Sequence, residues 1–173
     1  TKSVPTPIGS QTWRYVKATN ISSTYAITQS GQLWSFGNNF TGQLGLKVNQ
    51  GAHRSSPTQV GTATYWNTVI ASHILPTVFA LPNNGVLLNW GDNSVRQISS
   101  ITGDPGFMEP VTAGLINKFN MSWTLMSSSG SQFSGPPNNG GHGLALRDDG
   151  AICSIGNNVT AQLGVGYFSS INN

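Results

Sequence analysis

Short runs in which apolar and polar residues alternate recur along the chain, and each run ends at a small or polar turn residue. In the run over 32–36, Leu33 and Ser35 would lie on one face and the aromatic residues on the other, which is the two-residue period of a β-strand. Two similar runs precede it, over 13–18 and 24–28. The pattern predicts short strands joined by hairpin turns, and therefore an all-β fold.

One block of residues occurs three times. The copies begin at Gly31, Gly85 and Gly150, each at a turn where glycine can supply a positive φ. The motif positions are Gly31, Trp34, Gly37, Asn39, Gly42, Gln43 and Gly45 in the first copy, Gly85, Trp90, Gly91, Asn93 and Gln97 in the second, and Gly150, Gly156, Asn158, Gln162 and Gly164 in the third. Successive units of three or four strands are typical of propeller blades.

The residue types in this block follow a fixed order. A Trp-x-x-Val run and an Ala-Ile or Ala-Leu strand are followed by an apolar and aromatic strand, then Gly-x-Asn and Gly-Gln-Leu-Gly. The order resembles the regulator of chromosome condensation repeat, and the resemblance extends over nearly the whole chain. It implies β-propeller-type blades. We expect the repeated Gly, Trp and Gln residues to serve blade geometry, because glycine supplies unusual backbone conformations, aromatic rings fill space and a buried amide satisfies loop groups.

The resemblance leaves the function open, since one fold hosts many functions. Proteins similar to this one include nucleotide exchange factors, chromatin binders, ubiquitin-ligase accessory domains and a secreted β-lactamase inhibitor. Others are repeat domains of bacterial surface proteins and of phage structural proteins. Fold alone cannot choose among these classes.

The expected units are 1–56, 57–109 and 110–173, of which the second is degenerate, and together they form one domain. Propellers close with about four to eight blades, so three blades leave apolar faces and strand edges at both ends. We therefore expect a partial or oligomer-completed propeller. The ends would be covered by copies of the chain, by other chains, or by further residues of a longer protein.

The third unit is longer than the others because of an insertion within 121–141 that is rich in Ser, Gly, Pro and Asn. Such a composition predicts an exposed loop, yet the segment contains Trp123, Leu125, Met126 and Phe133. One interpretation is a contact loop for a neighbouring subunit or ligand, since binding often resides in loops. The alternative is that Trp123 and Phe133 pack back on their own blade.

No catalytic constellation is evident. The carboxylates are Asp92, Asp104, Glu109, Asp148 and Asp149, and the histidines are His53, His73 and His142. The histidines lack the spacing of metal ligands. Asp104 and Glu109 flank a Pro-Gly turn and could bind a cation, but two carboxylates are few for calcium, which takes about six to eight oxygen ligands. The turn position of Asp148 and Asp149 explains their residue type. Cys153 replaces an apolar strand residue, so we expect a buried, inert thiol. The chain is expected not to be an enzyme and to need no metal or other cofactor.

Charge is scarce. The 173 residues include only 8 Lys and Arg and 5 Asp and Glu, or 8% charged residues where about 25% is usual. The cations are far apart, so no nucleic-acid-binding patch is expected. The sequence shows no apolar run long enough for a membrane span and no signal peptide. Neutral polar residues therefore keep the surface soluble, and uncharged blade faces remain able to pack.

These observations favour a non-catalytic structural or interaction protein that acts through protein–protein assembly. The expected partners are other subunits, either copies of the chain or proteins of a virion or surface. The expected location is a virion, of phage type, or the outside of a cell, in a capsid decoration or tail component. The first alternative is an intracellular binding propeller of the nucleotide-exchange or chromatin type. A secreted inhibitor or a carbohydrate-binding propeller is the second, which the aromatic residues Tyr65, Trp66 and Trp123 would permit.

Overall fold

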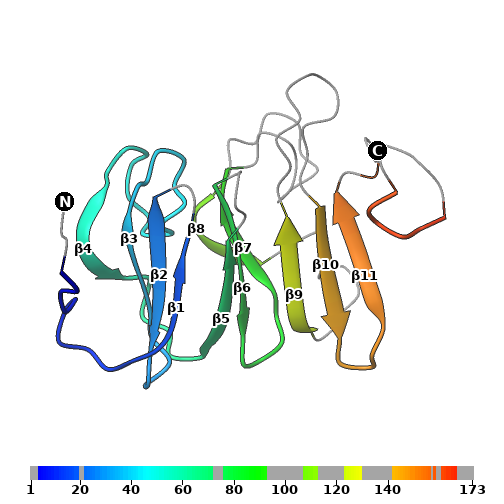
Figure 1. Ribbon diagram of the computed structural model, residues 1–173, viewed down its shortest axis with the longest axis horizontal. Helices are drawn as coiled ribbons and strands as arrows, with labels where there is room; N and C mark the ends of the chain where they lie inside the picture. The colour runs from blue at the N-terminus through cyan, green and yellow to red at the C-terminus, as the bar shows by residue number, and fades with distance from the viewer. Residues whose placement is uncertain are drawn as a thin grey trace.

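The computed structural model describes residues 4–19, 22–71, 76–92, 107–112, 123–129, 142–156, 158 and 161–166. This part of the chain contains eleven strands and no helix, hence no helix able to cross a membrane. The strands form three antiparallel sheets that stand side by side in a row (Figure 1). The all-β, propeller-type fold predicted from the sequence is confirmed.

The first two sheets have four strands each, and the third has three among the described residues. The first sheet, in spatial order, consists of β1 (Trp13–Ala18), β2 (Ser23–Thr28), β3 (Leu33–Gly37) and β4 (Arg54–Gln59). The second consists of β5 (Trp66–Ala71), β6 (Thr77–Pro82), β7 (Leu88–Gly91) and β8 (Phe107–Thr112). The third consists of β9 (Trp123–Ser129), β10 (His142–Arg147) and β11 (Ile152–Gly156). Consecutive strands within each sheet are neighbours, as is usual for elements that follow one another in the chain.

The larger apolar core lies between the first and second sheets. The first sheet contributes Tyr25, Ile27 and Leu33, and the second contributes Trp66, Val69, Ala71, Val78, Ala80 and Trp90. Within each strand these residues lie two positions apart on one face, except Trp66, which a register shift between Trp66 and Thr68 brings to the same face as Val69. Tyr15 of β1 reaches across and donates a hydrogen bond of 2.6 Å from its hydroxyl to the Val69 carbonyl. The two sheets are therefore held face to face by apolar burial and by a side chain that bonds the neighbouring backbone.

A smaller core lies between the second and third sheets. Phe79, Leu81 and Leu87 of the second blade pack against Trp123 and Ala145 of the third, with Ile70 and Cys153 at the margin. The second sheet is thus covered on both faces, whereas the first and third each bury only one face against another described sheet. Cys153 is a half-buried free thiol at this margin.

The sheets are offset from the repeat units expected from the sequence. Pro57 lies inside β4, which closes the first sheet, and Pro110 lies inside β8, which closes the second. Both strands are at a sheet edge, where a residue without an N–H group costs no ladder bond. Units ending at 56 and 109 therefore end in the middle of the strands that complete the preceding sheets.

The third sheet corrects the assignment of an exposed loop over 121–141. The first part of this segment is strand β9, which pairs with β10 along its length. Trp123 begins β9 as Trp13 begins β1 and Trp66 begins β5, so it is the third member of a repeated tryptophan position. Residues 130–141 lie outside the described residues.

Tyr25 offers a test of the core between the first two sheets. It is fully buried, and its hydroxyl donates a 2.7 Å hydrogen bond to the Gln43 carbonyl. Burial raises the pKa of Tyr25 above its ordinary value. The native state therefore keeps a proton that the unfolded chain releases above about pH 10, so stability is intact below that pH and falls as pH rises beyond it.

Replacing Tyr25 by phenylalanine is expected to lower the free energy of unfolding by about 1 kcal/mol near neutral pH. It should also reduce the loss of stability above about pH 10. Urea unfolding of both proteins on either side of that pH measures the two effects. Tyr65→Phe is the control, because Tyr65 is exposed. An alkaline loss that is the same in Tyr25→Phe and in the original chain would contradict the assignment.

Candidate interaction surfaces

The first sheet has one face that no other described sheet covers. Cross-strand register places Val16, Ala26 and Trp34 in one row of this face. We call the residues Trp13, Val16, Ala18, Trp34 and Phe36 the first end face. The rings of Trp13 and Trp34 meet edge to face with centroids 6.1 Å apart. Val16 is 68% exposed, so this end of the row presents apolar side chains to solvent.

The same positions in the second sheet are buried. The repeat aligns Trp13, Val16 and Ala18 with Trp66, Val69 and Ala71, which all belong to the core against the first sheet. Val69 is 1% exposed, whereas Val16 in the equivalent position is 68% exposed. The first end face therefore has the composition of a blade-to-blade interface, and no sheet of the described chain packs on it.

The third sheet also has one face that no other described sheet covers, at the other end of the row. The register pairs Leu146 with Ile152 and Leu144 with Ser154, on the side away from the second sheet. We call Leu144, Leu146 and Ile152 the third end face. Ile152 is 72% exposed, while Leu87, its equivalent in the second blade, is completely buried in the core that contains Trp123.

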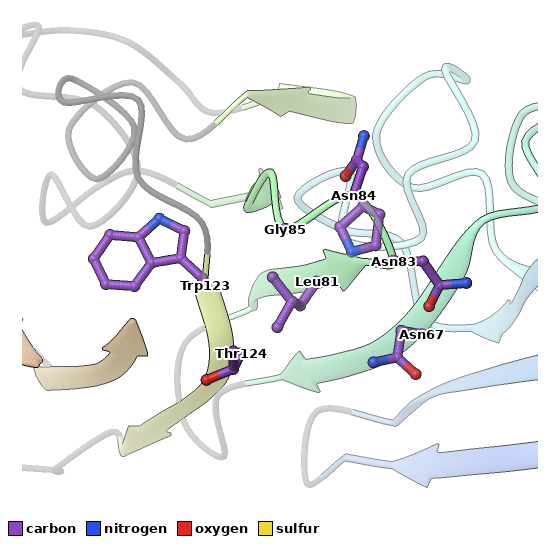
Figure 2. A pocket seen from close by; sticks show the side chains of 8 residues that line it. Asn67, Leu81, Asn83, Asn84, Gly85, Trp123 and Thr124 are labelled. Atoms are coloured by element: carbon purple, nitrogen blue, oxygen red, sulfur yellow. The ribbon is translucent and has the colours of Figure 1, made fainter. Parts of the chain in front are cut away.

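Two adjoining cavities form a polar groove beside the hairpin turns at 29–31 and 82–85. These turns lie at the bottom of Figure 1. One cavity, of about 360 Å³, is lined by residues that include Asn67, Asn83, Asn84, Trp123 and Thr124. A second, of about 300 Å³, shares Asn67 and Asn83 with it and continues to Arg14 and the turn at 29–31. Figure 2 shows the indole of Trp123 pointing away from the asparagines. The groove offers mainly neutral amide and hydroxyl groups, which are hydrogen-bonding groups that do not titrate near neutral pH.

Arg14 lines the second cavity and also links the first sheet to the second. Its guanidinium donates a hydrogen bond to the backbone carbonyl of Trp66, at the start of the next sheet. A cation that is committed to a backbone carbonyl still leaves donors for a ligand, because the guanidinium has five. Among the residues that line the two cavities, Arg14 alone is charged, so the groove is close to neutral.

The repeat motif shapes the loop that follows β3. The amide oxygen of Asn39 accepts a 3.0 Å hydrogen bond from the Leu44 N–H, and Asn158 does the same for Leu163. The side-chain oxygen of Gln43 accepts from the backbone and hydroxyl of Thr41. These amides satisfy loop groups that would otherwise lack partners, which is a structural use of the motif.

The same loop contacts the next sheet. The carbonyl of Gln43 accepts hydrogen bonds from the Tyr25 hydroxyl and, at 2.8 Å, from the Trp90 indole. Gly45 lies so close to this indole that a Cβ atom would be 2.8 Å from Trp90 Nε1. Gly42 packs against Met108 of β8 in the same way. The motif therefore links one blade to its neighbour. Asn93 and Gln97 of the second copy lie outside the described residues.

Most of the remaining motif glycines have a positive φ. Gly31, Gly85 and Gly150 have it at hairpin turns. Gly37 and Gly91 have it at the ends of β3 and β7, and Gly164 has it in the loop of the third copy. Trp34 is half-buried on the first end face, Gln162 is half-buried, and Gly156 ends β11.

The titratable groups are dispersed over the described part of the chain. His53 accepts a hydrogen bond from the Asn39 N–H and packs edge to face on Phe40. Arg147 pairs with Asp149 at a hairpin turn, and Lys47 pairs with Glu109 at 3.1 Å. Among the described residues no three His, Cys, Asp or Glu side chains come together as a metal site would need. Asp104 and His73 lie outside them.

The candidate contact residues separate in the structure. Trp123 is 4% exposed in the core between the second and third sheets, where it packs against Leu81 and Leu87 of the same chain. It begins a strand and is not part of an exposed contact loop. Leu125 and Met126 lie in β9, where their backbones pair with Leu146 and Ala145. Phe133 lies outside the described residues. Trp66 is equally buried, so of the three aromatic residues considered for carbohydrate binding only Tyr65 is exposed.

Sequence reasoning passed over Val16, Leu144 and Ile152. Each is an ordinary apolar residue at a strand position where a buried residue is expected, so none attracts notice alone. Their signal lies in a comparison of equivalent positions between copies once the sheets that cover each copy are known. The sequence contains the repeats, but the order of the sheets is needed to see which copies lack a neighbour.

The comparisons with known proteins agree with this architecture. The model of the regulator of chromosome condensation (RCC1) repeat matches residues 30–71, so the resemblance to this repeat is confirmed. No curated protein sequence matches the chain.

Solved structures with the same fold include one of a human protein and two of the yeast protein Prp20. Human WBSCR16 has a TM-score of 0.66 at 18% identity, and the match covers 88% of this chain and 35% of the WBSCR16 chain. Yeast RCC1 (Prp20), bound to Kap60, has a TM-score of 0.69 at 17% identity, covering 91% and 35%. Prp20p from Saccharomyces cerevisiae, which has binding properties to Gsp1p and histones, has a TM-score of 0.66 at 18% identity, covering 91% and 36%. The chain spans about a third of the length of each structure.

Proposed function

We propose that this chain is a non-catalytic interaction module in which propeller-type blades assemble with other protein subunits. The observation that carries the proposal is the contrast between equivalent positions. Val16 and Ile152 are mostly exposed, while Val69 and Leu87, which occupy the same places in the second blade, are buried against a neighbouring sheet. Apolar faces of this kind are exposed to water only at a cost, which contact with another protein removes.

The chemistry of the described surface supports a binding role in preference to catalysis. The groove at the hairpin turns is lined mainly by amides and hydroxyls, and none of its lining residues is a carboxylate. A general acid or base needs a titratable side chain in contact with the reacting group. Hydrogen-bonding groups around a shallow groove suit a polar neutral surface of a partner, at the edge of an apolar contact.

The setting that we propose is an assembly outside a cell or on a virion, of the kind formed by phage and bacterial surface proteins. Low charge supports it, because only 8% of the residues are charged and a face without ions packs without desolvating them. The neutral Ser, Thr and Asn residues keep the remaining surface hydrated.

A second candidate is a binding propeller of the nucleotide-exchange or chromatin type. The structural likeness to Prp20p favours it, since that protein has binding properties to Gsp1p and histones. The eight Lys and Arg residues are far apart in the sequence, so the chain lacks the cluster of cations that binding to a strongly acidic partner such as DNA would need. Binding of purified Gsp1p or of histones to the chain, measured by calorimetry, would favour this candidate over the first.

Cross-linking in the native source tests the proposed function. A lysine-reactive reagent applied to intact material is expected to join the chain to another polypeptide through Lys17 or Lys47, since Lys47 is largely exposed and Lys17 partly so. Mass spectrometry then identifies the joined peptides. Recovery of the chain from intact material with no cross-link to another polypeptide, or to a second copy, would contradict a role in assembly.

A further inference from the structure

We propose that the partner of each end face is a second copy of this chain, docked head to tail. The first end face of one copy would pack on the third end face of the next. The inference rests on the proposed function and specifies its partner. It commits to a second copy because this one chain carries both halves of the contact.

The contact is already present twice inside the molecule. Between the first and second sheets, Tyr25, Ile27 and Leu33 meet Trp66, Val69 and Ala71. Between the second and third, Phe79, Leu81 and Leu87 meet Trp123. In both places a set of large residues on one sheet covers the tryptophan at the start of the first strand of the next sheet.

The two end faces continue this series in opposite directions. The third end face, Leu144, Leu146 and Ile152, occupies the repeat positions of Phe79, Leu81 and Leu87. The first end face carries Trp13, Val16 and Ala18 at the repeat positions of Trp66, Val69 and Ala71. Each face therefore has the residues that match the other, and Figure 1 places the first and third sheets at opposite ends of the row.

The pairing of unlike faces also follows from how blades stack. Each internal contact joins two different faces, so repetition of the same contact between copies is heterologous. Heterologous contacts generate a ring when the rotation closes, and propellers close with about four to eight blades. None of the side chains that form the two end faces is charged, so the contact does not require an ion to lose its water.

Two substitutions separate the faces. Val16→Asp places a carboxylate on the first end face and Ile152→Asp places one on the third. Both side chains are largely exposed within one chain, so neither change disturbs the core. Val86→Asp is the matched control, because Val86 is an exposed valine at the β6–β7 turn and lies on neither end face. Circular dichroism and thermal melting establish that all three variants fold.

Sedimentation velocity over a range of concentrations measures the assembly. We expect the original chain and Val86→Asp to self-associate, and each end-face variant to weaken self-association by about a hundredfold or more, as a buried unpaired carboxylate would. An equimolar mixture of Val16→Asp and Ile152→Asp should form a one-to-one dimer and nothing larger. In that mixture one intact first end face can meet one intact third end face, and both outer faces are blocked.

Other outcomes overturn the inference. Self-association of either variant alone would mean that a face pairs with itself. A monomer in every sample, the mixture included, would mean that the faces serve further blades of a longer protein or a different partner. In that case a cross-link to another polypeptide in the native source keeps the proposed function, while the absence of any cross-link removes both.

Discussion

Replacing Trp90 by alanine is expected to lower the free energy of unfolding by about 3–5 kcal/mol. Trp90 is completely buried in the core between the first and second sheets, and its ring meets those of Tyr25 and Trp66 edge to face. Its indole N–H also donates to the Gln43 carbonyl. A loss of this size is a large part of the stability of a domain, which is about 5–15 kcal/mol, so the variant should melt far below the original chain.

Trp34→Ala is the matched comparison. Trp34 is the second residue of β3 and lies on the first end face, where it is half-buried, and the same substitution there should cost clearly less. Trp90→Phe separates packing from the hydrogen bond, since phenylalanine keeps most of the ring contact but cannot donate. Urea unfolding of the Val16→Asp form of each variant, which removes self-association, gives the comparison. Equal losses for Trp34→Ala and Trp90→Ala would contradict the description of two differently covered faces.

Substitution of Gly37 by alanine is expected to cost about 3 kcal/mol or more. Gly37 ends β3 with φ +105°, and a Cβ atom would lie 2.2 Å from the Ser22 carbonyl oxygen. The obstacle is backbone, which cannot rotate out of the way. Gly91 ends β7 under the same constraint, with its Cβ position 2.1 Å from the Pro76 carbonyl oxygen. The glycine after the aromatic strand residue is therefore required by close approach of the preceding hairpin strand.

Gly51→Ala distinguishes this steric requirement from backbone preference. Gly51 also has a positive φ, of +82°, but a Cβ atom there would meet nothing within 4 Å. Its substitution should cost only the left-handed backbone term, about 1–2 kcal/mol. Thermal and urea unfolding of Gly37→Ala, Gly91→Ala and Gly51→Ala provide the measurement. A Gly51→Ala loss as large as the other two would show that φ alone explains the motif glycine.

Much of the fold could be predicted because it depends on local pattern. The alternation over 32–36 and the glycines at 31, 85 and 150 predict β3, β7, β11 and the turns that precede them, and the structure has strands and turns there. The prediction failed at Trp123, where a composition rich in Ser and Gly indicated a loop. Pairing with β10 and burial against Leu81 and Leu87 make the start of this segment a strand, because tertiary contact outweighs local preference.

The candidate interaction surface could not be predicted in the same way. Val16 and Val69 are the same residue type at the same repeat position, and no local property distinguishes them. Their exposure differs because the first sheet lies in front of Val69, while no sheet of the described chain lies in front of Val16. Tryptophans 66 and 123 likewise suggested exposed aromatic groups, and the stacking of sheets buried both.

The sequence by itself determined that the chain consists of three related all-β units, since residue period, turn glycines and the repeated motif are properties of neighbouring residues. It also determined that charge is scarce everywhere. Only the tertiary structure decided which apolar faces are covered, where each sheet begins and ends, and that the polar groove is formed by turns from different blades. Burial depends on residues far apart in the chain coming together, so the same valine is core in one blade and surface in another.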